Sequence, residues 1–395
     1  MKCLYRRLLL LAVMIIIANH VQSSMIVAPH GSGRSGDLSG VNVAAPDDGS
    51  SALITNPAGV VSDAKNQALI AIQPGSLTVD YSNTSTGYNG RGSTPYAALD
   101  VWYGLGERWG WSMGVGAYGA VGAAFDLPSE PAINHDGYLG KLAQINFAVN
   151  VGKEVHPGIR VGLQLAPSYV SQKTKSPSPL GEVSFDADGF GFSYAAGVVY
   201  EPIENWSFGL MYRSKGKAEL EGDGKVGAAR QDVSVNFVTP QYLTTGLAWW
   251  LSKDFRLMAN LRWTDYEDFE EGEFESKQFP ALNGPLMSKT HNRTRWGIAF
   301  EYRILPRSWL RAGYTQGRAM IDDSAVRPNM FDNDNKMLML GYEIEYSDLM
   351  VGFTFGLATQ DVRKVSANEN PNFSGRYESA DTVFNAGARV TWRLR

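Results

Sequence analysis

Cysteine is almost absent from this sequence: the only one in 395 residues is Cys3, within an N-terminal segment typical of a removable leader. Without that segment the exported chain has no thiol, which excludes disulfides and cysteine-ligated metal sites. The formal net charge is only −4, so the basic stripe that binds nucleic acid is lacking as well. No metal-spaced histidine pair, GxSxG motif or phosphate loop occurs. We therefore expect a protein that is not an enzyme, binds no nucleic acid, and needs no cofactor and no metal.

Residues 1–23 are predicted to form a secretory signal peptide. Three basic residues, Lys2, Arg6 and Arg7, precede the apolar run Leu8–Ile17. Small residues then allow cleavage after about Ser23. The alternative, a membrane anchor, is disfavoured because the apolar run is too short to span a bilayer comfortably.

Long apolar runs are missing after residue 66, where apolar and other residues alternate instead. In DLMVGFTFGL (348–357), the odd-numbered positions are large and apolar, whereas the even-numbered ones include two glycines and Thr354. ARVTWRLR (388–395) alternates in the same way, with arginine or threonine at every second position. This period predicts β-strands, and segments of about nine or ten residues let a tilted strand cross a bilayer.

The connections between these segments sort into short and long ones that alternate along the chain. The short ones are 104–110, 152–158, 201–205, 251–254, 305–308 and 346–348. The long ones are 82–95, 127–138, 172–184, 219–237, 266–291, 318–335 and 361–379. A water-soluble sandwich would alternate too, but it has no reason to sort its loops in this way. We therefore predict an all-β fold, a fourteen-stranded antiparallel transmembrane β-barrel over residues 67–395, in the outer membrane of a Gram-negative bacterium.

Tryptophans gather beside the short connections. They are Trp102, Trp109, Trp111, Trp206, Trp249, Trp250 and Trp309. Because an amphipathic ring is stable where hydrocarbon meets headgroups, they are predicted to form a girdle at the periplasmic face of the membrane.

Residues 24–66 precede the first strand and lack the strand pattern. A fourteen-stranded barrel has a lumen that side chains alone do not fill, so we predict that this segment is a hatch, a plug folded inside the barrel. Its NPAG turn contains Pro57, which fixes φ, and Gly59, which tolerates a positive φ. The alternative is a solvated N-terminal tail.

Five segments, in order along the chain, resemble those of a known family. They are DDGSSALITNPAGV (47–60), LAQINFAVNVGKEVHPGIRVGLQLAPSYV (142–170), GVVYEPIENWSFGLMYRSKGKAELEGD (197–223), VTPQYLTTGLAWWLSKDFRLMANLRWTDYEDF (238–269) and RWGIAFEYRILPRSWLRAGYTQG (295–317). Taken together they resemble the FadL/TodX family of outer-membrane transporters for hydrophobic compounds, and the resemblance covers nearly all of the chain after the leader.

The resemblance implies where the hatch meets the wall. The family's Asn-Pro-Ala, here Asn56, Pro57 and Ala58, lies against a kink in the third strand that opens a lateral gap toward the membrane. That strand is predicted here at 110–126. It is rich in glycine: Gly114, Gly116, Gly119 and Gly122. Glycines in a strand often mark a bulge, although they also give room to a plug, and both interpretations stay open.

Charged residues fall on the face opposite the apolar one, and turning an arginine toward lipid at mid-membrane would cost about 2–4 kcal/mol. Arg160 and Arg262 are therefore expected in the lumen, either within a salt-bridged wall that grips the hatch or in contact with a substrate carboxylate. Four methionines also face inward by parity: Met211, Met258, Met339 and Met350. Their flexible side chains suit a path for apolar molecules, and equally suit packing against the hatch.

These expectations, with the resemblance, point to passive outer-membrane transport of hydrophobic molecules, foremost long-chain fatty acids, with lateral exit near the kinked third strand. An aromatic hydrocarbon channel of the same family is the first alternative. A structural or adhesive barrel without transport is the second, and a barrel hydrolase would need a catalytic dyad that the sequence does not show. The expected partners are fatty acids or aromatic hydrocarbons, together with outer-membrane lipid and lipopolysaccharide, and the expected state is a monomer.

Overall fold

The structure is a computed structural model that describes residues 31–83, 85–129, 137–178, 181–328, 332–379 and 383–394. The predicted signal peptide and residues 24–30 of the predicted hatch lie outside these residues. Within them, no helix combines the length and the apolar character needed to span a membrane.

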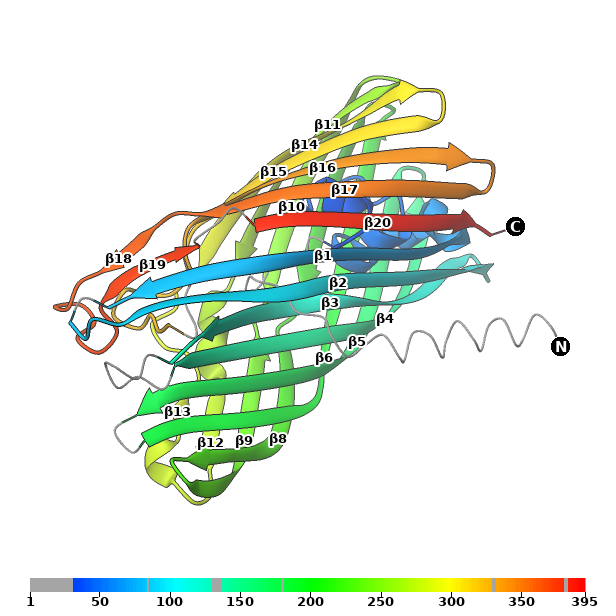
Figure 1. Ribbon diagram of the computed structural model, residues 1–395. Helices are drawn as coiled ribbons and strands as arrows, with labels where there is room; N and C mark the ends of the chain where they lie inside the picture. The colour runs from blue at the N-terminus through cyan, green and yellow to red at the C-terminus, as the bar shows by residue number, and fades with distance from the viewer. Residues whose placement is uncertain are drawn as a thin grey trace.

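The predicted barrel of fourteen antiparallel strands is confirmed (Figure 1). Twelve wall strands are single elements: β1 (Gln67–Ser82), β2 (Asn89–Arg108), β3 (Trp111–Leu127), β4 (Tyr138–His156), β5 (Ile159–Ser178), β6 (Gly181–Ile203), β11 (Phe255–Thr264), β14 (Arg293–Leu305), β15 (Ser308–Gly317), β16 (Asn335–Tyr346), β17 (Leu349–Gln360) and β20 (Val383–Arg393). The other two are each divided into two pieces, β7 (Trp206–Arg213) with β8 (Gly216–Val226), and β9 (Ala229–Thr239) with β10 (Tyr242–Ser252). The wall closes where β20 pairs with β1, from Gln67–Arg393 to Ile72–Ala388.

The wall strands turn their large apolar side chains outward. On β17, Phe353 and Phe355 are exposed while Thr354 is buried, as the alternation predicts. The same holds on β14, where Ile298 is exposed and Glu301 is buried. The outer surface is therefore apolar and the lumen beside these residues is polar, which is the arrangement of a membrane barrel.

All six short connections lie where the sequence predicts them, but two of the long ones are almost wholly strand, and half of a third, 82–95, belongs to β2. Strand β5 continues to Ser178 and β6 begins at Gly181, so most of the predicted loop 172–184 is strand. Strands β8 and β9 form a hairpin across the predicted loop 219–237. The hairpin persists beyond the membrane because its inward side chains, such as Leu220 and Val235, are apolar and buried while its outward ones are polar.

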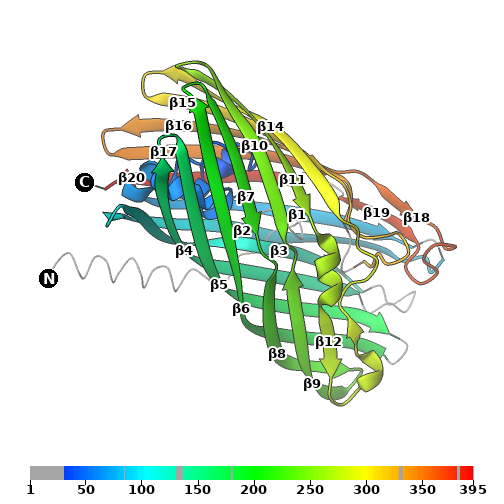
Figure 2. The same cartoon turned by 180° about the vertical axis from the view of Figure 1, so that it is seen from behind.

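The remaining elements belong to the outer loops. They are η5 (Tyr266–Glu271), β12 (Glu273–Ser276), η6 (Pro280–Leu282), β13 (Gly284–Pro285), β18 (Arg363–Val365) and β19 (Gly375–Ser379). Figure 2 shows β12 beside β9 at the end of the barrel opposite the hatch, and the two strands are paired. Strand β19 likewise extends the wall by pairing with the end of β1.

The tryptophan girdle forms only in part. Trp109, Trp111 and Trp249 are exposed on the outer surface. Trp102 instead points into the lumen, where its indole Nε1 donates a hydrogen bond to Ala64 O at 2.7 Å. Trp250 also lies inside, under the guanidinium of Arg256 at 4.4 Å.

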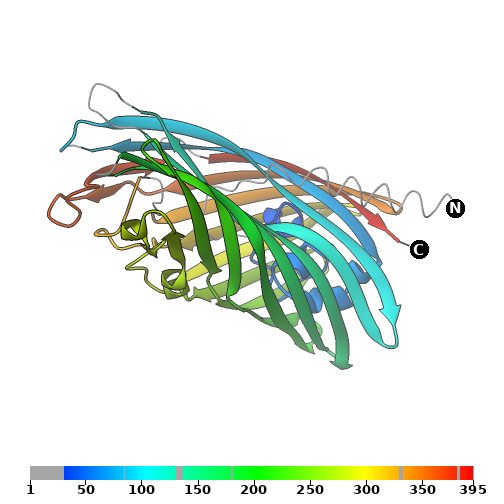
Figure 3. The ribbon, with the colours of Figure 1, turned by 90° about the horizontal axis from the view of Figure 1, so that it is seen from below.

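Residues 31–66 fill the lumen at the end where the short turns and the C-terminus lie (Figures 1 and 3). They contain four short helices: α2 (Arg34–Asp37), α3 (Gly49–Ile54), η2 (Pro57–Val61) and η3 (Asp63–Asn66). The side chain of Asp48 caps α3 by accepting a hydrogen bond from Ser51 N at 3.0 Å. Asn56 caps η2, with Pro57 in the first turn, where its missing N–H costs nothing. The segment is called the hatch below.

Candidate transport pathway

The Asn56–Ala58 turn of the hatch sits against strands β5 and β6. The Asn56 side chain accepts from Ala58 N at 3.1 Å and donates to Val198 O of β6 at 3.1 Å. A side chain at Gly162 would collide with the backbone of Pro57 and Ala58, and one at Gly197 would collide with Asn56 Oδ1. The hatch lies this close to the wall because both wall positions are glycine.

The predicted glycines of the third strand have different neighbours. A Cβ at Gly116 would lie 2.9 Å from Leu53 of α3, and one at Gly114 would meet the Trp102 ring. In this chain α3 therefore approaches β3, and η2, which begins at Pro57 of the Asn56–Ala58 turn, contacts β3 as well. Both glycines make room for packing, one of the two interpretations left open.

Strand β3 has a bulge next to the point where its pairing with β2 ends. Its pairing with β4 shifts register between Gly119 and Val121, so one residue is left over at Ala120. Its pairing with β2 runs from Arg108–Trp111 to Asp100–Tyr118, and no further ladder pair joins the described residues of these strands beyond that point. Bulges disrupt the ladder locally, and here the β2–β3 ladder ends two residues before the bulge.

Farther along, β2 and β3 meet again. A Cβ at Gly92 would collide with the carbonyl of Asp126, and the Tyr88 hydroxyl donates to Pro128 O at 2.6 Å. Residues 93–99 of β2 and 119–125 of β3 therefore face each other across an unpaired interval that is bounded at both ends. We call this interval the β2–β3 opening.

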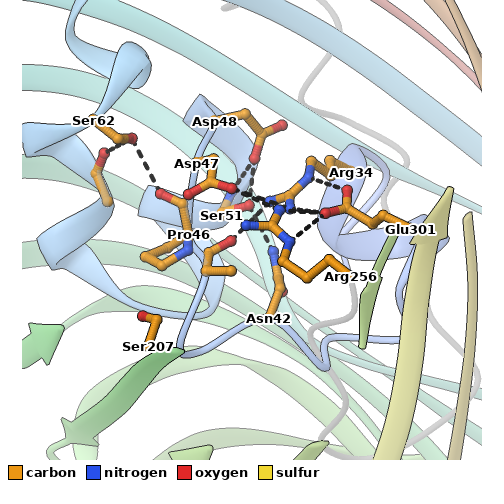
Figure 4. Close-up of polar contacts among 12 residues, drawn as sticks. Arg34, Asn42, Pro46, Asp47, Asp48, Ser51, Ser62, Ser207, Arg256 and Glu301 are labelled. Carbon is orange, nitrogen blue, oxygen red and sulfur yellow. Dashed lines mark hydrogen bonds and ion pairs between the residues drawn. The ribbon is translucent and has the colours of Figure 1, made fainter. Parts of the chain in front are cut away.

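Four arginines and four carboxylates join the hatch to the opposite side of the wall. The hatch contributes Arg34, Asp37 and Asp47, and the wall contributes Arg256, Glu301, Arg311, Glu343 and Arg389. Arg34 and Arg256 converge on Glu301 and Asp47 (Figure 4). Arg34 Nη2 lies 2.6 Å from Glu301 Oε2, and Arg389 Nη1 lies 2.7 Å from Asp37 Oδ2. The set, called the ionic cluster below, is balanced in charge, and all its side chains are buried except that of Asp47, which is partly exposed.

Three other lumen arginines hydrogen-bond only to neutral groups, although the carboxylate of Asp332 is close enough to Arg295 to act on its charge. Arg213 Nε donates to the Tyr242 hydroxyl at 3.0 Å, and Arg262 Nε donates to Thr244 Oγ1 at 3.2 Å. Arg295 Nη2 donates to Asn335 Oδ1 at 3.0 Å. Among the described residues, no carboxylate oxygen is paired with any of these three guanidinium groups.

The same three arginines lie close to one another. Arg262 and Arg295 are direct partners across β11 and β14, and like charges in that relation repel. Arg213 and Arg262 share the ring of Tyr242, with guanidinium carbons 5.9 and 4.6 Å from its centroid. Arg213 Nη1 and Arg295 Nε are buried without a hydrogen-bond partner. This cationic patch can accept an anion, which would supply both the missing charge and the missing acceptors.

Arg160, the other predicted lumen arginine, is already paired: its Nη2 lies 2.7 Å from Glu201 Oε1 near a short turn. Position in the chain does not indicate that Arg213 and Arg295 lack a carboxylate partner, because that depends on which neighbouring strands carry the carboxylates.

The predicted methionines divide between the hatch and the outer lumen. Met211 packs with Val43, and Met258 packs with Leu38 and other hatch residues. Met350 is only partly buried, near a short turn. Met339 lies in a separate cluster of buried apolar side chains toward the outer loops. That outer apolar cluster includes Val170, Phe185, Leu220, Val235, Phe237, Phe269, Phe274 and Met320.

Aromatic residues complete the outer apolar cluster at its far end. The ring centroids of Tyr81 and Tyr377 are 4.6 Å apart, and those of Tyr88 and Tyr138 are 5.7 Å apart. An apolar interior thus adjoins the outer loops, and the cationic patch lies between it and the hatch. No group of three or more His, Cys, Asp or Glu side chains in the described part of the chain is arranged to hold a metal.

The sequence model of the outer membrane protein transport protein family (OMPP1/FadL/TodX) matches residues 26–392. The chain belongs to this family. It is therefore an outer-membrane β-barrel transport protein of a Gram-negative bacterium, as the resemblance predicted. No curated protein matches the chain.

Solved structures share its fold at low sequence identity. A Pseudomonas aeruginosa FadL homologue has a TM-score of 0.76 at 13% identity, covering 96% of this chain and 100% of that one. The Pseudomonas putida toluene transporter TodX has a TM-score of 0.72 at 16% identity, covering 95% and 100%. The Ralstonia pickettii toluene transporter TbuX has a TM-score of 0.67 at 12% identity, covering 96% and 100%.

Proposed function

We propose that this member of the FadL/TodX family carries long-chain fatty acids, passively and without catalysis. The observation behind the proposal is the cationic patch, in which Arg213 and Arg262 are buried, Arg295 is half-buried, and all three guanidinium groups hydrogen-bond to neutral groups beside the outer apolar cluster. A fatty acid supplies a carboxylate for the arginines and an acyl chain for the apolar surroundings. Charge-assisted hydrogen bonds from guanidinium to carboxylate are about twice as strong as neutral ones.

The proposed route begins among the outer loops. Their apolar side chains, including Phe269 and Phe274, belong to the outer apolar cluster and would receive the acyl chain. The carboxylate then reaches the cationic patch above the hatch. Movement of the hatch would admit the substrate to the β2–β3 opening, through which it would leave sideways into the bilayer. Because the wall closes on itself through β1 and β20, a single copy suffices, in contact with membrane lipid and lipopolysaccharide.

Aromatic hydrocarbons are the second candidate. TodX and TbuX, which share the fold, are toluene transporters. A hydrocarbon would use the same apolar cluster but would leave the cationic patch without a counter-charge, so this candidate gives Arg213, Arg262 and Arg295 no part in recognition.

Uptake of radiolabelled oleate and toluene distinguishes the two candidates. We would compare cells that carry the protein, its deletion, Arg262→Gln and the matched control Arg160→Gln. Arg160 serves as the control because its guanidinium is already paired with Glu201. We expect oleate uptake to need the protein and to fall for Arg262→Gln but not for Arg160→Gln. Oleate uptake equal in cells with and without the protein would refute the fatty acid proposal, and toluene uptake that needs the protein would then favour the second candidate.

A further inference from the structure

The last turn of hatch helix α3 is held by three wall side chains. Asn150 Nδ2 donates to Ala52 O at 2.7 Å, and Gln164 Nε2 donates to Leu53 O at 2.9 Å. Arg213 Nη2 also donates to Leu53 O, at 3.3 Å. The final carbonyls of a helix have no partner within it, so these donors supply the missing bonds. One of the three is an arginine of the cationic patch.

The same side chains reach the edge of the β2–β3 opening. Gln164 Oε1 accepts a hydrogen bond from the Tyr118 hydroxyl at 3.2 Å, and that hydroxyl accepts one from Asn146 at 3.0 Å. Tyr118 is the last β3 residue paired with β2 before the opening. The guanidinium of Arg213 also lies 5.5 Å from the Tyr118 ring centroid. The patch, α3 and the opening are therefore joined by direct contacts.

The two ends of the hatch are held in different ways. Residues 34–47 include Arg34, Asp37 and Asp47 of the ionic cluster. Residues 49–62, GSSALITNPAGVVS, contain no charged side chain at all. Among the described residues, Arg213 is the only charged wall residue that hydrogen-bonds to α3. A ligand that engages Arg213 therefore acts on α3 and leaves α2 anchored.

We propose that Arg213 couples substrate binding to release of the α3 end of the hatch, while the α2 end stays fixed by the ionic cluster. This inference rests on the proposed fatty acid function. A carboxylate is a stronger acceptor than the Leu53 carbonyl, and Arg213 Nη1 is a buried donor without a partner. When the guanidinium turns to the carboxylate, Leu53 O keeps only the hydrogen bond from Gln164. In the docked state Arg213 must give up its bond to Leu53 O to bind the ligand, so the state with α3 released binds the ligand more tightly than the docked state. That difference in affinity is what shifts the hatch equilibrium.

Cysteine labelling tests the coupling, because the only natural cysteine lies in the predicted leader. Thr55→Cys places a cysteine directly after α3, and Ser39→Cys places one shortly after α2. Thr55 and Ser39 are both about 1% exposed, so each cysteine reports on exposure of its end of the hatch. The purified Cys3→Ser protein carrying one of these changes is treated with a water-soluble maleimide. It is treated alone, with oleate, and with oleyl alcohol, which has the same chain without the carboxylate. We expect oleate to speed labelling of Thr55→Cys by about tenfold, within the usual range of allosteric coupling, and to leave Ser39→Cys unchanged.

Two further samples assign the effect to Arg213. Arg213→Gln should still bind oleate through Arg262 and Arg295 but should lose the faster labelling of Thr55→Cys. Arg160→Gln should keep it. Oleate binding is measured in the same samples by quenching of tryptophan fluorescence.

The possible outcomes separate the coupling from the proposed function. If oleate binds and the labelling of Thr55→Cys does not change, the coupling is wrong while the fatty acid proposal stands. Equal acceleration at Ser39→Cys would show that the hatch moves as one piece, which also overturns the coupling. If oleate does not bind at all, both proposals fail.

Discussion

Neutralising Glu301 should loosen the hatch without unfolding the barrel. Glu301 accepts hydrogen bonds from three arginines, Arg34 of the hatch and Arg256 and Arg311 of the wall. Its side chain is 2% exposed and those of the three arginines are 5–7% exposed. Glu301→Gln keeps the shape of the side chain but leaves four cations against three anions in the ionic cluster.

The size of the effect follows from burial. Removing one partner of a buried ion pair costs about 3–5 kcal/mol, because the remaining charge is left without compensation. Since about 1.4 kcal/mol is a factor of ten, the ratio of docked to undocked hatch should fall by roughly two to four orders of magnitude. The closed hydrogen-bonded wall does not depend on the cluster, so the barrel itself should persist.

The assay measures leakage through an undocked hatch. Cells that carry Glu301→Gln should become sensitive to vancomycin, a bulky antibiotic that an intact outer membrane excludes, while the purified protein keeps the gel mobility shift of a folded barrel on heating. Glu345→Gln is the matched control. Its partner Arg393 lies 2.5 Å away at the rim, but the two side chains are 27% and 44% exposed, so this pair is worth roughly 0–1 kcal/mol.

A charge-balanced variant sharpens the test. Arg256→Gln combined with Glu301→Gln leaves three cations and three anions, so it should recover part of the resistance to vancomycin. If Glu301→Gln cells are no more sensitive than Glu345→Gln cells at equal expression, the ionic cluster does not hold the hatch, and the reasoning fails.

Three further changes test other parts of the structure. Gly162→Val should displace the hatch and admit vancomycin, because its side chain would collide with the backbone of Pro57 and Ala58. Gly284→Ala, with open space around it, should not. Deleting Ala120 should restore the β3–β4 register, close the β2–β3 opening and reduce oleate uptake to the level of the deletion strain, whereas Ala120→Val should retain uptake. Burial raises the pKa of Asp332, in the outer loop before β16, to about 6 from its ordinary value near 4. The folded loop therefore favours the protonated acid, so its resistance to protease should fall as pH rises from about 4 through 6. Asp332→Asn should be insensitive to pH in that range, and an equal decline in both proteins would refute this role of Asp332.

The alternation of residues was enough to predict the wall. A period of two and loops of unequal length depend only on neighbours in the chain, so all six short connections and the number of strands could be predicted. The direction of a side chain near a turn could not. Strand β2 shifts register between Gly104 and Gly106, and such a shift changes the face on which nearby residues lie. The inward position of Trp102, predicted for the membrane girdle, is a contact with the hatch that sequence position alone does not reveal.

For the charged residues, too, the face of the strand can be read from neighbours in the sequence, whereas the ion-pair partner cannot. Arginines at the positions that alternate with outward apolar residues, such as Arg256 and Arg311, are buried, but their partners are set by pairing between distant strands and by the hatch. Arg311 and Arg389 meet Asp37, which lies about 270 residues or more before them in the chain. Arg262 faces Arg295 because β11 and β14 pair in that register. The strand register thus pairs some arginines with carboxylates and leaves other arginines without one. The paired arginines anchor the hatch, whereas the others can bind an anion, and the sequence alone does not show which arginine belongs to which group.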